Sequence, residues 1–355
     1  MKHLELFAGI GGFRRATDLL SIDGIMNFES VGFSEIDQKA ITTYKSNFDT
    51  SNDVEIGDIV SFTENENNIA SLPDFNFLSG GFPCQTFSMM GKQAGFAEER
   101  GQMFFRIIDI LKIKRPKYVL LENVKNLRTH NKGKTIEEIQ RQLENLGYNV
   151  FYDVFNSSDF HLPQTRNRVL IFATTSRLPK NFIFDSKSVA GCFDKMYKNL
   201  SVFNYTSTIE ILSQKVDSRY FLSEKIKPTL LADGSANFKS NSEINLAIAR
   251  PLTATMHKMH RACQDNYYSQ DFIESHGVIN PAKTHSKEEL AKLPIRKLTP
   301  EEAFLLQGFP SSFATNARAQ KVSDGALYKQ AGNAVSVNTI YAALYYLIVN
   351  KVIKE

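Results

Sequence analysis

A glycine-rich turn near the N-terminus constrains the fold of this chain more than any other stretch. The apolar residues 3–7 predict a short strand, the sequence AGIGGF follows at residues 8–13, and a helix is expected from there to about Leu20. A strand, a glycine turn and a helix N-terminus form a nucleotide-type turn, because glycines let a ligand approach the backbone closely. Arg14 stands where the dinucleotide pattern GxGxxG has its third glycine, which weakens a nicotinamide interpretation.

Two acidic residues follow the next two predicted strands. Residues 31–34 lead to Glu35, and residues 54–56 lead to Asp58. In an open parallel sheet, ligands bind outside the carboxyl ends of the strands, where Glu35 is suited to accept from ribose hydroxyls and Asp58 from an exocyclic amine. Single acids after strands are usually solvated turn residues, but the series of glycines, Glu35 and Asp58 favours an adenosine-containing ligand.

Cys84 is the strongest candidate for a reactive side chain. The apolar residues 75–78 predict a buried strand, Gly80 and Gly81 allow a sharp turn after it, and Pro83 fixes one backbone dihedral directly before the thiol. Open α/β sheets place reactive groups at such strand ends. A free cysteine is also commonly a small core residue, and the local sequence leaves both interpretations open.

A carboxylate and two arginines follow later predicted strands. Glu122 ends the apolar strand 118–121, so burial should raise its pKa and suit it to donate a proton. Arg166 and Arg168 stand at alternate positions at the start of the strand predicted at 169–174 and are expected to point the same way. Arginine is well suited to hold a phosphate or a carbonyl oxygen. The alternatives are a helix-capping acid and a surface arginine pair.

The segments between these strands predict a lid and two helices. Residues 85–102 are small, polar and glycine-containing, and a loop of that length is usually functional or disordered. Within it, Lys92 and Arg100 are candidates for phosphate contacts. Helices are expected at 103–114 and 135–146, the second with a capping box formed by Thr135 and Glu138.

The regular alternation of strands and helices stops near residue 177. Residues 178–294 are polar and irregular, and their densest patch of basic residues lies at 250–261. His257 and His260 lack a third plausible metal ligand nearby, so we expect polar contacts and no metal site. Order returns at 298–308 and at 330–352. We therefore expect a main domain at 1–180, completed by 328–355, and a smaller domain at 181–327.

Composition limits the compartment and the partners. The chain has 355 residues, a formal net charge of +4 and three widely spaced cysteines, which argue against a disulfide framework. The charge permits nucleic-acid binding by a local basic face without requiring it. No run of apolar residues approaches the length of a transmembrane span, and the N-terminus lacks a signal-peptide pattern. We expect a cytoplasmic protein that has no contact with membranes.

Taken together, these segments resemble the bacterial type of the DNA cytosine-5 methyltransferase family. The match rests on motifs in a fixed order over most of the chain outside 178–294. They are the turn at 7–12, GFPCQ at 81–85, ENV at 122–124, QTRNR at 164–168, the segment 296–310 and QAGNAV at 330–335. The resemblance implies an α/β fold with the Rossmann-like sheet of S-adenosylmethionine-dependent methyltransferases, and a second, smaller and irregular target-recognition domain.

The resemblance also implies the roles of the catalytic residues. Cys84 would add to C6 of cytosine, which carries electron density to C5. Glu122 would contact N3 and the exocyclic amine. Arg168, with Arg166, would stabilise charge on O2 and hold the thiolate or a nearby phosphate. Because C6 is unreachable inside a duplex, the base would be flipped out, with residues 85–102 as the lid.

The cofactor and DNA contacts that the resemblance implies are expected at these residues. For S-adenosylmethionine they are Phe7, Ala8, Gly9, Ile10, Gly11, Gly12, Glu35, Ile36, Asp58, Ile59, Phe82, Pro83, Met103, Asn333, Ala334 and Val335. For DNA they are Gln85, Ser88, Lys92, Arg100, Arg250, His257, Lys258, His260 and Arg261.

Three other functions remain open at this point. A tRNA-acting branch shares the catalytic set, but its late Cys-Phe-Thr motif has only Cys192-Phe193-Asp194 as a counterpart here, at another place. A non-catalytic DNA-binding regulator of the same fold is opposed by the presence of the whole catalytic set. A nicotinamide oxidoreductase leaves the Pro-Cys-Gln turn unexplained. We expect a monomeric enzyme that acts on double-stranded DNA in a bacterial cytoplasm, with S-adenosylhomocysteine as product and a restriction endonuclease as possible companion.

Overall fold

The chain folds into two compact units. The computed structural model describes residues 1–83, 103–235, 238–258 and 261–354. The first unit consists of Met1–Asn156, Asn167–Val202 and Thr339–Glu355, and the second of Ser157–Arg166 and Phe203–Asn338.

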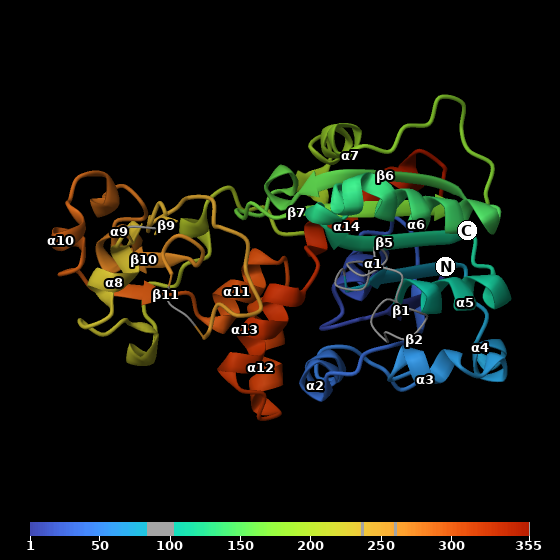
Figure 1. Cartoon of the computed structure of the whole chain (residues 1–355), viewed down its shortest axis with the longest axis horizontal. Helices are drawn as coiled ribbons and strands as arrows, with labels where there is room; N and C mark the ends of the chain where they lie inside the picture. Colours follow the sequence, from blue (N-terminus) through green and yellow to red (C-terminus); the bar gives the residue numbers. More distant parts are fainter. Residues whose placement is uncertain (84–102, 236–237, 259–260, 355) are drawn as a thin grey trace. The chain divides into compact units, whose positions relative to one another are not determined.

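A mixed sheet forms the centre of the first unit (Figure 1). Its strands are β1 (Lys2–Leu6), β2 (Glu29–Phe33), β3 (Val54–Glu55), β4 (Phe77–Gly81), β5 (Tyr118–Val124), β6 (Asn149–Asn156) and β7 (Asn167–Thr174). In the described part of the chain their order is β3-β2-β1-β4-β5-β7-β6. The first five strands run parallel, and β7 is antiparallel to both of its neighbours. This architecture confirms the predicted α/β fold class.

The central strands are buried on both faces, as their almost wholly apolar sequences require. Alternate residues of a strand point to opposite faces of the sheet. In β5 the side chains of Val119 and Leu121 belong to the core cluster that also contains residues of α3 to α6. Leu120 lies on the other face and is fully buried as well.

Helices account for the burial on both faces. Those that contribute to the shared core cluster are α3 (Ile59–Thr63), α4 (Glu66–Ser71), α5 (Met103–Lys114) and α6 (Lys134–Asn145). The others of this unit are α1 (Gly12–Ile22), α2 (Gln38–Lys45), α7 (Ser186–Phe193) and α14 (Val337–Val349), of which the last begins in the second unit. Tyr341 of α14 donates a hydrogen bond to Asp23 at the end of α1 (2.6 Å), and its ring meets that of Phe193 of α7 edge-on.

The predicted capping box of the helix at 135–146 is wrong. α6 begins at Lys134 after Gly133, and no side chain caps it. Thr135 instead shares a hydrogen bond with His130 (2.7 Å), and Glu138 pairs with Arg141. The chain enters α6 through a turn with positive φ at Gly133, which leaves Thr135 inside the helix where its hydroxyl is out of place for a cap.

The second unit is irregular and rests on short elements. Its strands are β8 (Gly234–Ser235), β9 (Phe238–Lys239), β10 (Tyr267–Ser269) and β11 (Ile295–Lys297), and its helices are α8 (Lys227–Leu231), α9 (Gln270–Glu274), α10 (Lys287–Leu290), α11 (Pro300–Leu306), α12 (Ser311–Ala319) and α13 (Asp324–Asn333). β10 and β11 pair antiparallel, as β8 and β9 do. A small apolar cluster that includes Leu230, Tyr267 and Ile295 packs α8, β10 and β11 together.

The boundaries of the two units differ from the boundaries at 180 and 327 that we expected from the sequence. Residues 157–166 belong to the second unit because Gln164 and Arg166 bond to backbone groups of that unit. α13 belongs there too, and the hydroxyl of Tyr328 donates to the carbonyl of Leu298 (2.5 Å). Hydrogen bonds between segments far apart in the sequence therefore decide the boundaries.

One described stretch, residues 324–349, is long and apolar enough to cross a membrane. It spans α13 and α14, and 78% of its most apolar window is buried inside the structure. Such burial is typical of the core helix of a globular protein.

A buried ion pair organises the second unit. The guanidinium of Arg296 donates to both carboxylate oxygens of Glu302 at 2.8 and 2.9 Å, and the two side chains are 0% and 1% exposed. The same carboxylate accepts from the backbone amides of Ser213 and Thr299, both at 2.8 Å. Both carboxylate oxygens therefore have partners, whereas Nε of Arg296 is buried without a hydrogen bond to any described residue.

A buried carboxyl group lies under the glycine turn of the first unit. Glu5 in β1 is 1% exposed and accepts from the amide of Phe13 (3.1 Å) and from the hydroxyl of Tyr44 (3.3 Å). Burial raises the pKa of Glu5 to about 8, although these two hydrogen bonds and the charge of Arg14 act in the opposite direction. Arg14 is itself paired with Asp53.

We expect Glu5→Gln to stabilise the protein increasingly as the pH rises. The carboxyl group ionises near its ordinary pKa of 4.5 in the unfolded chain but near 8 in the folded one, so the native protein loses stability between these values, by up to about 4 kcal/mol. A glutamine side chain does not ionise, so the variant does not lose this stability as the pH rises. Urea unfolding at pH 5, 6, 7 and 8 measures the difference, with the exposed Glu64→Gln as control. A difference that stays constant over this range would contradict the prediction.

Breaking the Arg296–Glu302 pair should be costly. We expect Glu302→Ala to lower the free energy of unfolding by about 3–5 kcal/mol, because the Arg296 charge is left buried without its partner. The matched control is Arg141→Ala, which removes an exposed partner of Glu138 and should cost less than about 1 kcal/mol. Denaturant unfolding measures both, and equal losses in the two variants would disprove the role of burial.

Candidate active site

The candidate residues of the first unit gather where the parallel strands end. The strand order reverses between β1 and β4, and ligands of open α/β sheets bind at such a switch point. Leu6 of β1 pairs with Gly80 of β4, and Gly81 pairs with Glu122 of β5. The register thus places the glycine turn and the turn before Cys84 next to the C-terminal part of β5, where Glu122 lies inside the strand because β5 continues to Val124.

The glycine turn has a backbone conformation that requires glycine at two positions. Gly9 has φ +56° and Gly11 has φ +83°, and both values are unfavourable for other residues. A Cβ atom on Gly11 would also lie 2.3 Å from the ring of Phe48. At Gly9 a Cβ atom would meet no atom of the described residues within 4 Å. Phe7 adopts a positive φ as well, a strained state that is common at functional sites.

Glu35 connects the end of β2 to the glycine turn. Its carboxylate accepts from the amide of Gly9 at 2.8 Å and from the amides of Ile36 and Asp37 at 2.8 and 2.9 Å. Ile36 beside it is 67% exposed, which is unusual for a large apolar side chain. The structure therefore brings together three of the predicted cofactor positions.

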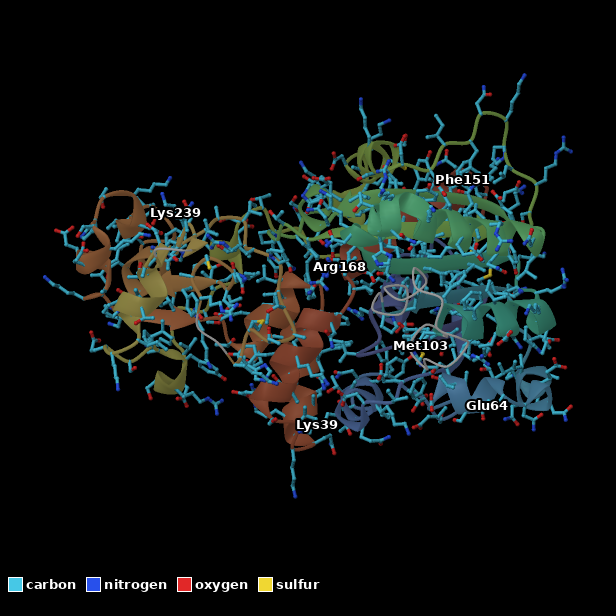
Figure 2. The ribbon with its side chains drawn as sticks, in the orientation of Figure 1. Lys39, Glu64, Met103, Phe151, Arg168 and Lys239 are labelled. Carbon is cyan, nitrogen blue, oxygen red and sulfur yellow. The ribbon has the colours of Figure 1, made fainter. Side chains whose placement is uncertain are left out.

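The other predicted cofactor residues of the first unit have varied environments. Asp58 caps α3 by accepting from the amide of Val60 (3.0 Å), a structural task compatible with a ligand contact through its exposed side. Ile59 is buried, as is Phe82, whose ring lies 5.7 Å from that of Phe104. Pro83 is exposed, and Met103, labelled in Figure 2, is half-buried at the first position of α5.

Glu122 and Arg168 form an ion pair. The Nε atom of Arg168 lies 2.9 Å from Oε1 of Glu122, and the side chains are 19% and 12% exposed. Arg168, labelled in Figure 2, belongs to β7. This strand runs antiparallel to β5, and Arg168 pairs with Val124 there. The positive guanidinium attracts the ionised carboxylate. The argument from the sequence considered only the burial of Glu122 and not this attraction.

Asn123 supports the turn before Cys84, a role that sequence reasoning missed. Its amide nitrogen donates to the carbonyl of Phe82 (2.8 Å), its oxygen accepts from Val124, and the residue is 2% exposed. The available signal was a polar amide inside an apolar strand, directly after Glu122. Cys84 itself lies outside the described residues, together with the predicted Gln85, Ser88, Lys92 and Arg100.

Arg166 has three backbone carbonyls among its partners. It belongs to the second unit, is 1% exposed, and its guanidinium donates to the carbonyls of Leu252 (3.0 Å), Gly332 (3.0 Å) and Ala334 (2.8 Å). The expectation that both arginines point the same way assumed that the strand includes Arg166. β7 begins at Asn167, so the period-2 rule does not apply across the pair.

The predicted DNA contacts that the structure describes lie in the second unit. Arg250 donates to the carbonyl of Glu243 (3.0 Å), and Arg261 to the side chain of Gln264 (3.0 Å). Burial lowers the pKa of His257, and the charges of Lys258 and Lys297 add to this effect. His260 lies outside the described residues.

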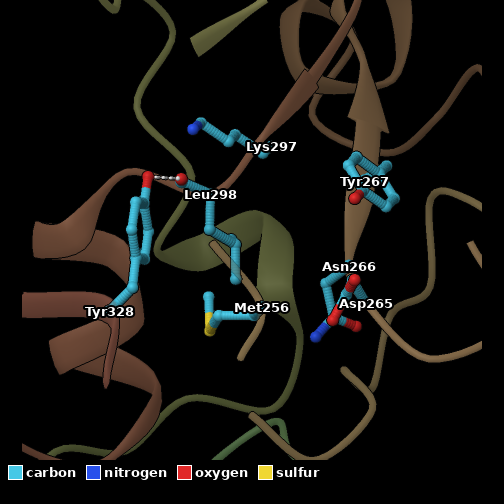
Figure 3. Close-up of a pocket in the computed structure, with 7 residues that line it drawn as sticks. All are labelled: Met256, Asp265, Asn266, Tyr267, Lys297, Leu298 and Tyr328. Carbon is cyan, nitrogen blue, oxygen red and sulfur yellow. Dashed lines mark hydrogen bonds between the residues drawn. The ribbon is translucent and has the colours of Figure 1, made fainter. Parts of the chain in front are cut away.

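Lys297 joins this basic region and was not predicted. Its ammonium group lies 5.3 Å from the ring centre of Tyr328 and 6.0 Å from that of Tyr220, within reach of cation–π attraction. It lines a small pocket with Met256, Asp265, Asn266, Tyr267, Leu298 and Tyr328 (Figure 3). The sequence signal was weak, because one lysine on a short strand resembles any surface residue.

The residues at the glycine turn fit an adenosine-containing cofactor. No described side chain occupies the space at Gly9, the turn precedes the N-terminus of α1, and the carboxylate of Glu35 lies against it. The Glu122–Arg168 pair supplies an acid and a cation at the neighbouring strand ends. Such a set can polarise a ring that carries both a nitrogen and a carbonyl oxygen.

Comparisons with known proteins agree with this arrangement. A model of the family "C-5 cytosine-specific DNA methylase" matches residues 1–348. The chain is 39% identical over 341 residues to type II methyltransferase M1.ScrFI of Lactococcus lactis subsp. cremoris, covering 96% of this chain and 76% of the relative. It is 33% identical to type II methyltransferase M.DsaV of Dactylococcopsis salina, covering 96% and 84%. The solved structure of Entamoeba histolytica methyltransferase EhMeth is similar in fold, with a TM-score of 0.73, 20% identity and coverage of 100% and 99%. The chain therefore belongs to the C-5 cytosine-specific DNA methylase family.

Proposed function

We propose that this DNA cytosine-5 methyltransferase modifies one specific double-stranded sequence through a covalent bond between Cys84 and C6 of a flipped-out cytosine. Membership of the family makes S-adenosylmethionine the methyl donor. The observation that carries the proposal is the Glu122–Arg168 ion pair, which the β4–β5 register places beside Gly81, three residues before Cys84.

The chemistry explains why these residue types are needed. C5 of cytosine is a poor nucleophile, and addition of the Cys84 thiolate to C6 moves electron density to C5. Glu122 holds N3 and the exocyclic amine, and stabilises the ring while charge moves through it. Arg168 stabilises negative charge on O2 and orients Glu122 through their ion pair. The bound cofactor supplies an electrophilic methyl group, after which loss of the C5 proton and elimination of Cys84 restore the aromatic ring.

The protein must also bring the base to these residues. C6 lies inside the stack of a duplex, so the cytosine has to leave the helix before Cys84 can reach it. Residues 85–102, which lie outside the described residues, would act as the lid, and Gln85, Ser88, Lys92 and Arg100 are the candidate DNA contacts among them. The second unit would read the bases in the major groove, with Arg250, His257, Lys258, His260 and Arg261 as candidate contacts.

We further propose that the chain is the modification enzyme of a restriction–modification system and acts as a monomer in a bacterial cytoplasm, at the nucleoid. The names of its type II relatives support this setting. A companion endonuclease would recognise the same site without stable binding to this chain.

Two alternative functions can be distinguished from this proposal by experiment. tRNA methylation would use the same catalytic set, but the chain has only Cys192-Phe193-Asp194, at the end of α7, in place of the late Cys-Phe-Thr motif of that branch. A non-catalytic regulator would bind DNA and cofactor without forming a covalent adduct.

We expect tritium from methyl-labelled S-adenosylmethionine to enter unmethylated DNA and not tRNA. Cys84→Ser should abolish the transfer, because the hydroxyl is a far weaker nucleophile than the thiolate. Filter-bound radioactivity measures the transfer, and bisulfite sequencing of the product gives the target. Label in tRNA alone would leave the mechanism intact and change the substrate, whereas cofactor binding without any transfer would support the regulator.

The Glu122–Arg168 pair should act as a unit. We expect Glu122→Gln to lower kcat about 10²–10⁴-fold, the range for general acid–base groups, and Arg168→Lys to lower it at least about tenfold. The double variant should lose much less than the product of the two effects, since each residue depends on the other. The control is Arg141→Lys, in the exposed ion pair between Arg141 and Glu138, which should leave kcat unchanged. Fully multiplicative losses would show that the two residues act independently.

A further inference from the structure

The guanidinium of Arg166 connects two segments of the second unit that have different predicted tasks. Its Nη1 atom donates to the carbonyl of Leu252 at 3.0 Å, at the start of the segment expected to read DNA. Its Nη2 atom donates to the carbonyls of Gly332 and Ala334 at 3.0 and 2.8 Å, in the segment expected to contact the cofactor. One buried side chain thus holds both segments by their backbones.

The two segments also touch directly at Gly332. A Cβ atom at this position would lie 2.3 Å from the carbonyl carbon of Thr253 and 2.4 Å from the amide nitrogen of Ala254. Backbone therefore packs on backbone, and only glycine allows this approach. A displacement of one segment has to move the other.

Two glutamines reinforce the same connection. Gln164 is fully buried, accepts from the amide of Leu252 (2.9 Å) and donates to the carbonyl of Leu306 (2.9 Å). Gln307 donates to the carbonyl of Ala331 (2.7 Å). Buried hydrogen-bond networks of this kind make an arrangement rigid when their members are satisfied.

We propose that Arg166 is a positioning residue that couples DNA binding to cofactor binding, by holding residues 252–254 and 332–334 as one rigid element. The inference rests on the proposed function, which assigns the DNA contacts to residues 250–261 and cofactor contacts to Asn333, Ala334 and Val335. Because the two segments move together, a ligand that holds one segment in place also holds the other, so the second ligand restricts less motion when it binds. Such coupling is reciprocal and typically amounts to 5–150-fold in affinity, by the general range for linked sites.

This assignment separates Arg166 from the catalytic role expected for it beside Arg168. At 1% exposure, and with three backbone carbonyls as acceptors, its guanidinium is used inside the second unit. The planar fork of an arginine reaches several acceptors at fixed angles, whereas the ammonium group of a lysine is a single point. Lysine at this position should therefore keep the charge and lose the connection.

The test measures the affinity for S-adenosylhomocysteine by calorimetry, with and without a duplex that carries the target found by bisulfite sequencing. The ratio of the two dissociation constants is the coupling factor, and we expect at least about fivefold for the unaltered protein. Arg166→Lys should bring the factor close to one. Arg168→Lys is the matched control, since it should keep the factor while turnover falls. A scrambled duplex shows whether the coupling depends on the target.

Gly332→Ala provides a second perturbation, because it leaves the Arg166 side chain itself unaltered and forces the two segments apart. It should lower the coupling factor as Arg166→Lys does, and it decides the question if Arg166→Lys does not fold by circular dichroism. An unchanged factor in a folded variant, or a factor of one in the unaltered protein, overturns the inference while methylation of DNA still supports the proposed function. Failure to methylate DNA at all would instead contradict the proposed function.

Discussion

The register of the parallel strands is the constraint on which the site depends. Parallel strands joined through helices end at the same edge of a sheet, so residues far apart in the sequence meet without any contact that brings them together individually. The pairing of Leu6 with Gly80 and of Gly81 with Glu122 fixes the relative height of the glycine turn, the cysteine turn and the acid. A shift of one residue of β5 against β4 would turn Glu122 to the other face of the sheet.

Much of this edge could be predicted from the sequence, because its signals are local. An apolar run followed by glycine or a single acid identifies a strand end, and the ordered series of such ends identifies the fold. The glycine turn at residues 8–12 was identified in the same way, and its positive φ angles at Gly9 and Gly11 are a finding of the structure. The contribution of Asn123 could not be found in this way, since its partner Phe82 lies forty-one positions earlier and is contacted through the backbone.

Arg166 and the unit boundaries illustrate the same limit. Backbone carbonyls are identical in every residue, so no sequence pattern indicates that those of Leu252, Gly332 and Ala334 accept from this guanidinium. The boundary at 180 was inferred from a change in composition, whereas the division of the chain follows hydrogen bonds that composition does not reveal. The capping box at Thr135 failed for a related reason, because a turn at Gly133 decided where α6 begins.

The division into units has a consequence for the order in which the protein folds during synthesis. The first unit needs residues 339–355, where Tyr341 bonds to Asp23, and these residues are translated after the whole of the second unit. The large sheet can form early, but the face that α14 covers stays open to water until the ribosome has made the last helix. Domains usually fold as units from the N-terminus during translation. In this chain the N-terminal unit is completed only after residues 203–338 of the second unit have been made, so the apolar surface that α14 covers is exposed while that stretch is translated.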